Sequence, residues 1–252
     1  LHLTEAGRLA FDHAEAIFQT GQELLDQFRR RQASPRQHLR IGAVGPLSKN
    51  LQFDFIQPLL DRRNLQLTVA SGSLEELLQQ LREHQLDLVL SNIPVRADQE
   101  DNAFNHLLGE MPAYLTGNLA VDRRGREFPE WLEGVPLFLP SRQSQVRADF
   151  DALLVESGVE PDIRAEVDDM ALLRLLALSE QGLALVPAIV VKHELQSRRL
   201  TQVYRVPGLA ERFYAITLRR RFGTGWLEEV VSTFRKSLTA YAAPLKPAGR
   251  KR

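Results

Sequence analysis

The sequence predicts an α/β protein in which a long N-terminal helix precedes two α/β halves linked by two crossovers. Strand-like segments alternate with helical segments of about ten residues, which is typical of βαβ units on a parallel sheet. The alternation restarts near residue 136, and a strand-like segment near residue 213 returns the chain to the first half. Ligands of such sheets usually bind at the carboxyl ends of the strands, so we expect the functional residues there.

The first predicted element is a helix over residues 5 to 31, which would be about 40 Å long at about 1.5 Å per residue. Thr4 offers an N-cap hydroxyl for this helix. Two apolar stripes run along this helix. The first is a heptad seam of Ala10, Ala14, Ile17, Gly21, Leu24 and Phe28, and the second consists of Phe11, Phe18 and Leu25. A helix with two stripes needs partners on two sides. This favours pairing with its copy in another subunit over the alternative, an ordinary helix on the protein's own core.

In the first half, we expect strands at residues 39 to 44, 65 to 70 and 86 to 90, and helices at residues 50 to 61 and after Ser73. Alternating residues mark the first two strands, and a short apolar run marks the third. The second helix has an inward face of leucines at helical spacing: Leu74, Leu77, Leu78 and Leu81. The polar residues 96 to 105 and 122 to 130 are expected to be surface loops or edges.

In the second half, we expect strands at residues 136 to 140, 163 to 167, 182 to 187 and 213 to 218, and helices at residues 146 to 157, 170 to 179 and 226 to 238. Gly158 is placed to end the first of these helices, and Asp168 and Asp169 are placed to cap the second. The last strand and helix would complete the first half after the chain returns.

Composition excludes several classes of protein. Lys plus Arg equals Asp plus Glu at 32 each, so no overall positive field draws the chain to nucleic acid or to a membrane. The basic residues 246 to 252 are expected to form a solvated terminus, with a tail that contacts DNA as the alternative. The absence of Cys excludes disulfides and thiolate metal sites and fits the cytoplasm.

No catalytic constellation is visible. The six His residues show no zinc-site spacing, and neither Gly-x-Ser-x-Gly nor Ser-x-x-Lys occurs. Gly223-Thr224-Gly225 lacks the third glycine of a dinucleotide fingerprint and is expected to be a turn. We therefore do not expect an enzyme.

Hydroxyl side chains instead collect between predicted strands and helices. Five serines each follow a predicted strand and precede a helix: Ser48, Ser71, Ser73, Ser141 and Ser144. Each one alone is explained as a cap or turn residue, but together they would line the carboxyl edges, where helix N-termini present free N–H groups to a ligand. The pair Asp168-Asp169 is explained first as an N-cap and second as carboxylates facing a cation.

Several short segments, in this order and spacing, resemble LysR-type transcriptional regulators: Leu3-Thr4-Glu5-Ala6-Gly7, Leu39-Arg40-Ile41-Gly42, Leu86-Asp87-Leu88 and Gly182-Leu183-Ala184-Leu185-Val186-Pro187. The resemblance implies an effector-binding domain of two Rossmann-like subdomains, like those of periplasmic binding proteins. It divides the chain into residues 1 to 34 (the end of a winged helix-turn-helix and the dimerisation helix), 38 to 112 with 213 to 241 (subdomain I), 113 to 212 (subdomain II) and 242 to 252 (tail). It also implies that most of the helix-turn-helix is missing, so no DNA-binding residue is assigned.

Within this family, residues 42 to 49, 137 to 144 and 166 to 172 are similar to the branch that activates sodium/proton antiporter genes. The resemblance places effector contacts at Ser48, Lys49, Ser73, Ser141, Arg142, Gln143 and Ser144. The effector would be a small molecule or Na⁺, with Asp168, Asp169 and Ser48 as the first residues to consider for Na⁺; no other cofactor is implied, and the metal ligands stay unknown.

The sequence therefore predicts the effector-sensing and dimerisation part of a cytoplasmic LysR-family activator. Its expected partners are a second copy, as homodimer or homotetramer, promoter DNA through the missing N-terminal domain, and RNA polymerase, but no membrane. Ala14, Ile17, Gly21, Leu24 and Phe28 are the expected dimerisation residues. Two alternatives stay open on the same architecture: a solute-binding protein of a transporter, and an enzyme.

Overall fold

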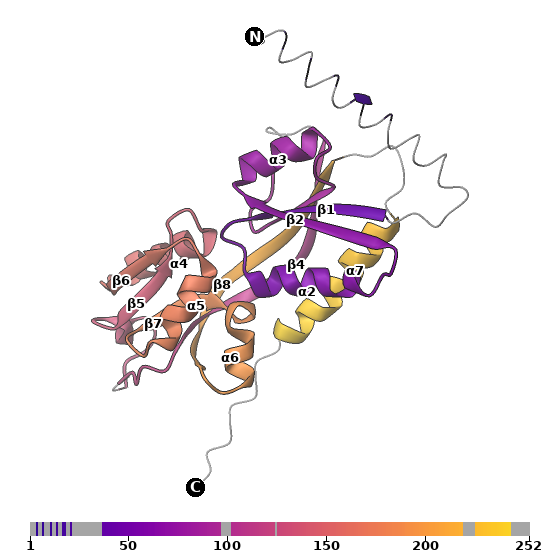
Figure 1. Cartoon of the computed structure of the whole chain (residues 1–252). Coiled ribbons are helices and arrows are strands. Elements are labelled where there is room, and N and C mark those ends of the chain that lie inside the picture. Colours follow the sequence, from indigo (N-terminus) through magenta and orange to yellow (C-terminus); the bar gives the residue numbers. More distant parts are fainter. Residues whose placement is uncertain are drawn as a thin grey trace.

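The computed structural model describes residues 37–96, 102–123, 125–218 and 225–242, together with seven positions nearer the N-terminus: Thr4, Gly7, Phe11, Ala14, Ile17, Phe18 and Gly21. The first lobe contains β1 (Gln37–Val44), α2 (Lys49–Leu60), β2 (Leu65–Gly72), α3 (Leu74–Arg82), β3 (Leu88–Ser91) and α7 (Gly225–Ala242). The second lobe contains η2 (Glu130–Leu132), β5 (Pro136–Pro140), α4 (Gln145–Ser157), β6 (Asp162–Val167), α5 (Met170–Leu178), β7 (Leu183–Pro187), η3 (Ala188–Val191) and α6 (Lys192–Gln196). Two long strands, β4 (Ala103–Gly117) and β8 (Thr201–Leu218), run through both lobes (Figure 1).

The eight strands of the described residues form one sheet in the order β2-β1-β3-β8-β4-β7-β5-β6. In the first lobe β1 is parallel to β2 and β3, and in the second lobe β5 is parallel to β6 and β7. Strands β4 and β8 pair antiparallel with each other, β8 with β3, and β4 with β7. It follows that β3 and β7 run in opposite directions, so the carboxyl ends of the parallel strands in the two lobes face each other.

The two-lobed α/β fold expected from the sequence is confirmed, and the predicted strands and helices of both halves are present. Gly158 ends α4 in the left-handed conformation, with a φ of 68°. The proposed division into residues 38 to 112 with 213 to 241 and residues 113 to 212 stays a prediction, because each crossover is one continuous strand that serves both lobes.

Most of the two crossovers is not predicted by the sequence pattern. Strand β4 begins at Ala103, inside a stretch predicted to be a loop or edge, and β8 begins twelve residues before the predicted start at Phe213. The reason is that both strands are irregular: the register of β4 shifts around Gly109 and again around Pro112. Residues that shift the register interrupt the polar–apolar alternation by which a strand is recognised.

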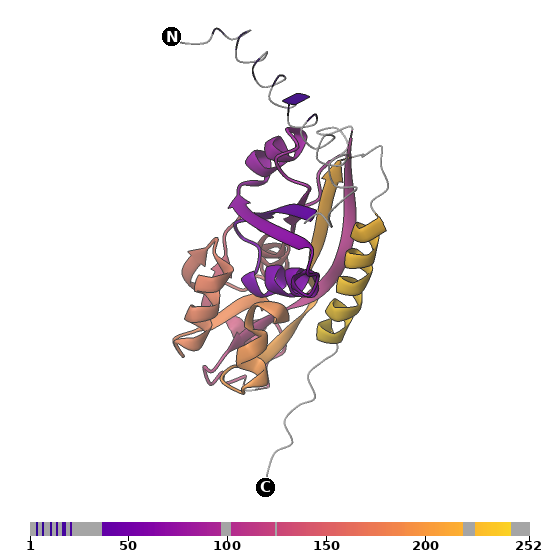
Figure 2. The same ribbon diagram turned by 45° about the vertical axis from the view of Figure 1, so that its right-hand side comes forward.

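Helix α7 packs along the crossovers, and Figure 2 shows it beside the long strands on the side of the sheet that α2 also covers. The contact is close, because a Cβ added to Gly109 would lie 2.9 Å from Leu238. The rings of Phe55 and Phe234 join α2 to α7 edge to face, with centroids 5.3 Å apart. Helix α7 therefore completes the core of the first lobe.

The two lobes are also joined through α2. The side-chain amide of Asn50 donates to the carbonyl oxygens of Ile189 at 2.9 Å and Val190 at 3.0 Å, both in η3. One turn further along α2, Asp54 accepts a hydrogen bond from the ammonium of Lys192 at the start of α6, and both side chains are buried. We call these contacts the α2 clasp.

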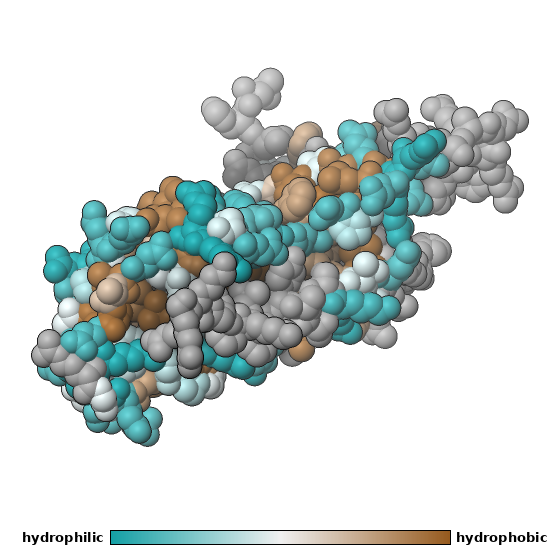
Figure 3. Space-filling model, turned by 90° about the horizontal axis from the view of Figure 1, so that it is seen from below, coloured by the Kyte–Doolittle hydropathy of each residue, from teal (hydrophilic) through white to brown (hydrophobic). Residues whose placement is uncertain are grey.

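Several large apolar side chains of the single chain face solvent, and Figure 3 shows apolar patches between polar ones on the face seen from below. At the N-terminal helix, Ile17 is 72% and Phe18 is 75% exposed, and Phe11 is also exposed.

Gly7 donates its backbone N–H to the Thr4 hydroxyl at 3.2 Å, which confirms Thr4 as the N-cap. Leu24 and Phe28 of the expected dimerisation set lie outside the described residues, as do positions 243 to 252 of the predicted tail.

Lys192→Met should destabilise the fold by about 3 to 5 kcal/mol, because it leaves the buried Asp54 carboxylate without its cation. Urea unfolding of the full chain measures this loss. The matched control is Arg164→Ala, which breaks an ion pair with Asp162 in which Arg164 is exposed and should cost less than about 1 kcal/mol. Equal effects of the two changes would show that the α2 clasp does not hold the lobes together.

Candidate functional site

A cavity of about 380 Å³ lies between the two lobes. One wall comes from the segment after β3, namely Asn92, Ile93 and Pro94. The other wall is the start of α4 and the residues just before it, namely Gln143, Ser144, Gln145, Val146 and Asp149. The crossovers supply the floor, through Glu110 of β4 and through Gly208, Ala210, Glu211, Arg212 and Tyr214 of β8. Both walls follow carboxyl ends of parallel strands, which is the edge where ligands of open α/β sheets bind.

Glu211 is the buried charged residue of this cavity. Its side chain is 6% exposed, and one carboxyl oxygen accepts a hydrogen bond from the Asn92 amide at 2.7 Å. In the described part of the chain, no Lys or Arg lies within ion-pair distance of it. Burial raises the pKa of Glu211 from its usual 4.5 to about 7, and the Asn92 hydrogen bond offsets only part of this rise.

The other charged groups of the cavity are partly neutralised. Arg212 donates to Glu110 at 2.9 Å, directly across the β4–β8 ladder, and this hydrogen bond raises the pKa of Arg212. Asp149 accepts a hydrogen bond from the Gln145 amide at 2.7 Å, which leaves its charge unbalanced. With Glu211 ionised, the cavity therefore has an excess of negative charge.

The start of α4 contributes hydrogen-bonding groups that the protein itself does not use. Ser144 occupies the N-cap position, but its hydroxyl makes no capping bond and is buried without a partner. Gln143, beside it, is exposed at the same wall. Gln143 and Ser144 are thus the two predicted effector residues that the structure places at the cavity.

The loop that carries these two residues is held by a buried arginine that the sequence analysis missed. Arg147 is 1% exposed and donates to the Pro140 carbonyl, Glu166 and Asp151 at 3.0, 3.0 and 2.7 Å. The hydrogen bond from Arg147 lowers the pKa of Glu166. Arg147 thereby fixes where β5 ends and the loop over residues 141 to 144 begins.

Two further predicted residues lie in the same loop but are not among the residues that line the cavity. Ser141 donates its backbone N–H to the Val167 carbonyl at 2.9 Å, which joins the loop to the end of β6. Arg142 is exposed and lies 3.7 Å from Glu166. Their role as effector contacts stays a prediction.

The remaining predicted residues lie elsewhere. Ser48 is buried at the start of α2, and Lys49 beside it is exposed. Ser73 forms a capping box with Glu76, and Asp169 caps α5 by accepting from the Ala171 N–H at 2.6 Å. Asp168 is exposed. No three His, Asp or Glu side chains gather as a metal site among the residues that the structure describes, so the Na⁺ site stays a prediction without a located cluster.

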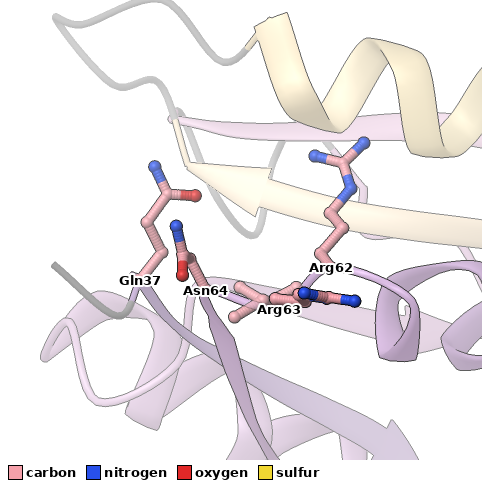
Figure 4. Close-up of a pocket in the computed structure, with 5 residues that line it drawn as sticks. Gln37, Arg62, Arg63 and Asn64 are labelled. Carbon is pink, nitrogen blue, oxygen red and sulfur yellow. The ribbon is translucent and has the colours of Figure 1, made fainter. Parts of the chain in front are cut away.

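A second cavity, of about 410 Å³, opens at the amino ends of β1 and β2. Gln37, Arg62, Arg63, Asn64 and Leu65 line it, and Figure 4 shows Arg62 extending toward α7. Arg62 pairs there with the exposed Glu229 at 2.8 Å. This position is at the opposite end of the strands from the interlobe edge, so we assign the ligand site to the interlobe cavity.

Within the described ranges, no helix is both long and apolar enough to span a membrane.

The comparisons with known proteins agree with this architecture. The chain matches the family described as LysR substrate binding domain over residues 32–239. It is similar to the transcriptional activator protein NhaR of Escherichia coli (strain K12), with 24% identity over 252 residues that cover 99% of this chain and 80% of NhaR.

Two solved structures show the same fold. The apo regulatory domain of HypT from Salmonella typhimurium superimposes with a TM-score of 0.59 at 19% identity, covering 83% of this chain and 97% of that domain. DarR from Vibrio fischeri in complex with DNA superimposes with a TM-score of 0.60 at 18% identity, covering 93% of this chain and 80% of DarR.

The raised pKa of Glu211 makes stability depend on pH in a defined direction. Between about pH 4.5 and 7 the folded state keeps a proton that the unfolded state loses, so this carboxyl lowers stability as the pH rises, by about 3 kcal/mol in total. Glu211→Gln should remove this dependence and leave the variant more stable than the natural protein at pH 8. Denaturant unfolding at pH 5 and pH 8 measures the free energy of unfolding of both proteins. If that free energy changed with pH equally in the two proteins, the result would contradict the burial of this charge.

Proposed function

Because the chain belongs to the LysR substrate-binding-domain family, we propose that it is the effector-sensing and dimerising part of a DNA-binding activator of sodium/proton antiporter genes. The family and the similarity to NhaR, a transcriptional activator, support the regulatory role. The likeness of residues 42 to 49, 137 to 144 and 166 to 172 to the antiporter branch supports the choice of target genes.

The observation that carries the sensing role is the cavity between the lobes. A small ligand or cation held there contacts both lobes and both crossovers at once. A ligand can regulate only by binding one arrangement of the lobes better than another. A site at the junction meets this condition, because any tilt of one lobe against the other changes the distance between its walls.

Dimerisation is supported by the N-terminal helix. Phe11, Ile17 and Phe18 expose three large apolar side chains along one helix in the single chain. A second copy of the chain, in a homodimer or homotetramer, would cover them, as the two predicted stripes require. The alternative, a solute-binding protein, shares the two lobes but gives no reason for this exposed helix.

The antiporter assignment is tested in the native host. Deletion of the gene should lower the transcripts of sodium/proton antiporter genes, and immunoprecipitation of the whole regulator should recover their promoters. Unchanged antiporter transcripts together with recovery of other promoters would contradict the assignment of target genes. Recovery of no promoter at all would contradict the regulatory role itself.

Ile17→Asp should weaken self-association of the full chain at least about tenfold, because it places a charge within the apolar seam. Analytical ultracentrifugation over a range of concentrations measures the change. Val155→Asp is the matched control, since Val155 is also exposed and apolar but lies on α4. A natural chain that stays monomeric at high concentration would favour the solute-binding alternative.

A further inference from the structure

We propose that the interlobe cavity binds an organic cation with a protonated amine, and that the carboxylate of Glu211 is its counter-charge. This inference rests on the proposed sensing function and names the chemical class of the effector. A consequence is that the cation competes with a proton for Glu211. Binding would then report pH as well as ligand concentration.

The environment of Glu211 favours a cationic ligand. A carboxylate this deeply buried needs partners, and Asn92 supplies one hydrogen bond to one of its two oxygens. The second oxygen has no partner among the described residues, yet it is not sealed off, since Glu211 lines the cavity. An ammonium has three N–H donors and a positive charge. It would supply the hydrogen bond that the second oxygen lacks and a positive charge for Glu211, since Arg212, the cation in the lining, is paired with Glu110.

The charges that face Glu211 sum to an excess of negative charge. Neighbouring Arg212 is already engaged with Glu110, Asp149 on α4 adds a further negative charge, and Tyr214 is neutral. The segment after β3 contributes no charged side chain to the lining. A cationic ligand is therefore attracted by the excess of negative charge, whereas an anion of the same size is repelled.

The size of the cavity fits an organic ligand. The cavity volume of about 380 Å³ falls in the range of sites for small organic molecules, roughly 300 to 1,000 Å³. A bare metal ion would leave most of this space unfilled, and the described residues offer no cluster of three acidic or His ligands. The exposed side chain of Gln143, which also lines the cavity, can bind a polar group at the far end of an organic ligand.

The coupling to pH has a definite sign. Below pH 7 Glu211 is increasingly protonated in the ligand-free protein, because burial raises its pKa to about 7. A ligand that binds only the ionised form loses about tenfold in affinity for each pH unit below that value. Above pH 7 the affinity levels off, since an alkylamine stays protonated up to about pH 10.

The test uses three probes of one skeleton on the full chain: n-butylammonium, n-butanol and n-butyrate. NMR titrations at pH 5.5, 7 and 8.5 follow the backbone amides of Asn92 and Ser144. We expect n-butylammonium to bind most tightly, with an affinity at pH 5.5 at least tenfold below that at pH 8.5. Tighter binding of n-butyrate, or a flat pH profile, would overturn the proposal.

Variants of the protein locate the effect. Glu211→Gln keeps the shape and should lower n-butylammonium affinity at pH 8.5 at least tenfold and flatten the pH profile. Glu156→Gln, a change of the same kind on an exposed part of α4, should bind like the natural chain. Asn92→Ala should move the midpoint of the pH profile upward, because it removes the hydrogen bond that lowers the pKa of Glu211. An unmoved midpoint would contradict the role of this carboxyl.

Two outcomes separate this inference from the function on which it rests. Displacement of n-butylammonium by Na⁺ or Li⁺ at constant ionic strength, at millimolar concentration and dependent on Glu211, would overturn the organic class in favour of a metal cation. Binding of n-butyrate by a chain that still recovers its promoters in the host would refute the cation while leaving the regulatory function intact. Failure of promoter recovery would instead remove the proposed function itself.

Discussion

The antiparallel ladder between β4 and β8 is the constraint on which the rest of the structure depends. It pairs Ala103 with Leu218 at one end and Gly117 with Thr201 at the other, so the same two strands lie at the centre of both lobes. The ladder sets the direction of β3 and β7 and thereby turns the carboxyl edges of the two lobes toward each other. It also forms the floor of the cavity between them, so architecture and ligand site share one set of hydrogen bonds.

The regular parts of the fold were predictable from sequence because each has a local signal. Strand β1 alternates, α3 carries its leucines at helical spacing, and Gly158 marks the end of α4. The crossovers lack such a signal. Pro207 and Gly208 interrupt the pairing of β8 with β4, and Gly208 has a φ of 73°. Pairing along the rest of the sheet compensates for this local irregularity. Tertiary contacts, which a single sequence does not display, decide these strands.

The same contrast explains which site residues were found. Ser144 was predicted because it stands between a strand and a helix, a position that topology brings to the carboxyl edge, and Gln143 was added by the family resemblance. Ser73 and Asp169 share that position, but their side chains are used as helix caps. Glu211 lies inside an unrecognised strand, and its importance comes from burial, which composition and spacing do not reveal.

The α2 clasp and the cavity lie on opposite faces of β4, and this arrangement limits how a ligand can act. Met111 faces η3, where its sulfur accepts the N–H of Ile189, so its neighbour Glu110 points to the other face and lines the cavity. On the face with η3, the buried Asp54–Lys192 pair joins the two lobes. If the proposed sensing function holds, a ligand that drew the α4 wall toward β3 would tilt the second lobe about the clasp rather than part the lobes. Ligand contacts at Glu211 would in this way cause one lobe to rotate against the other.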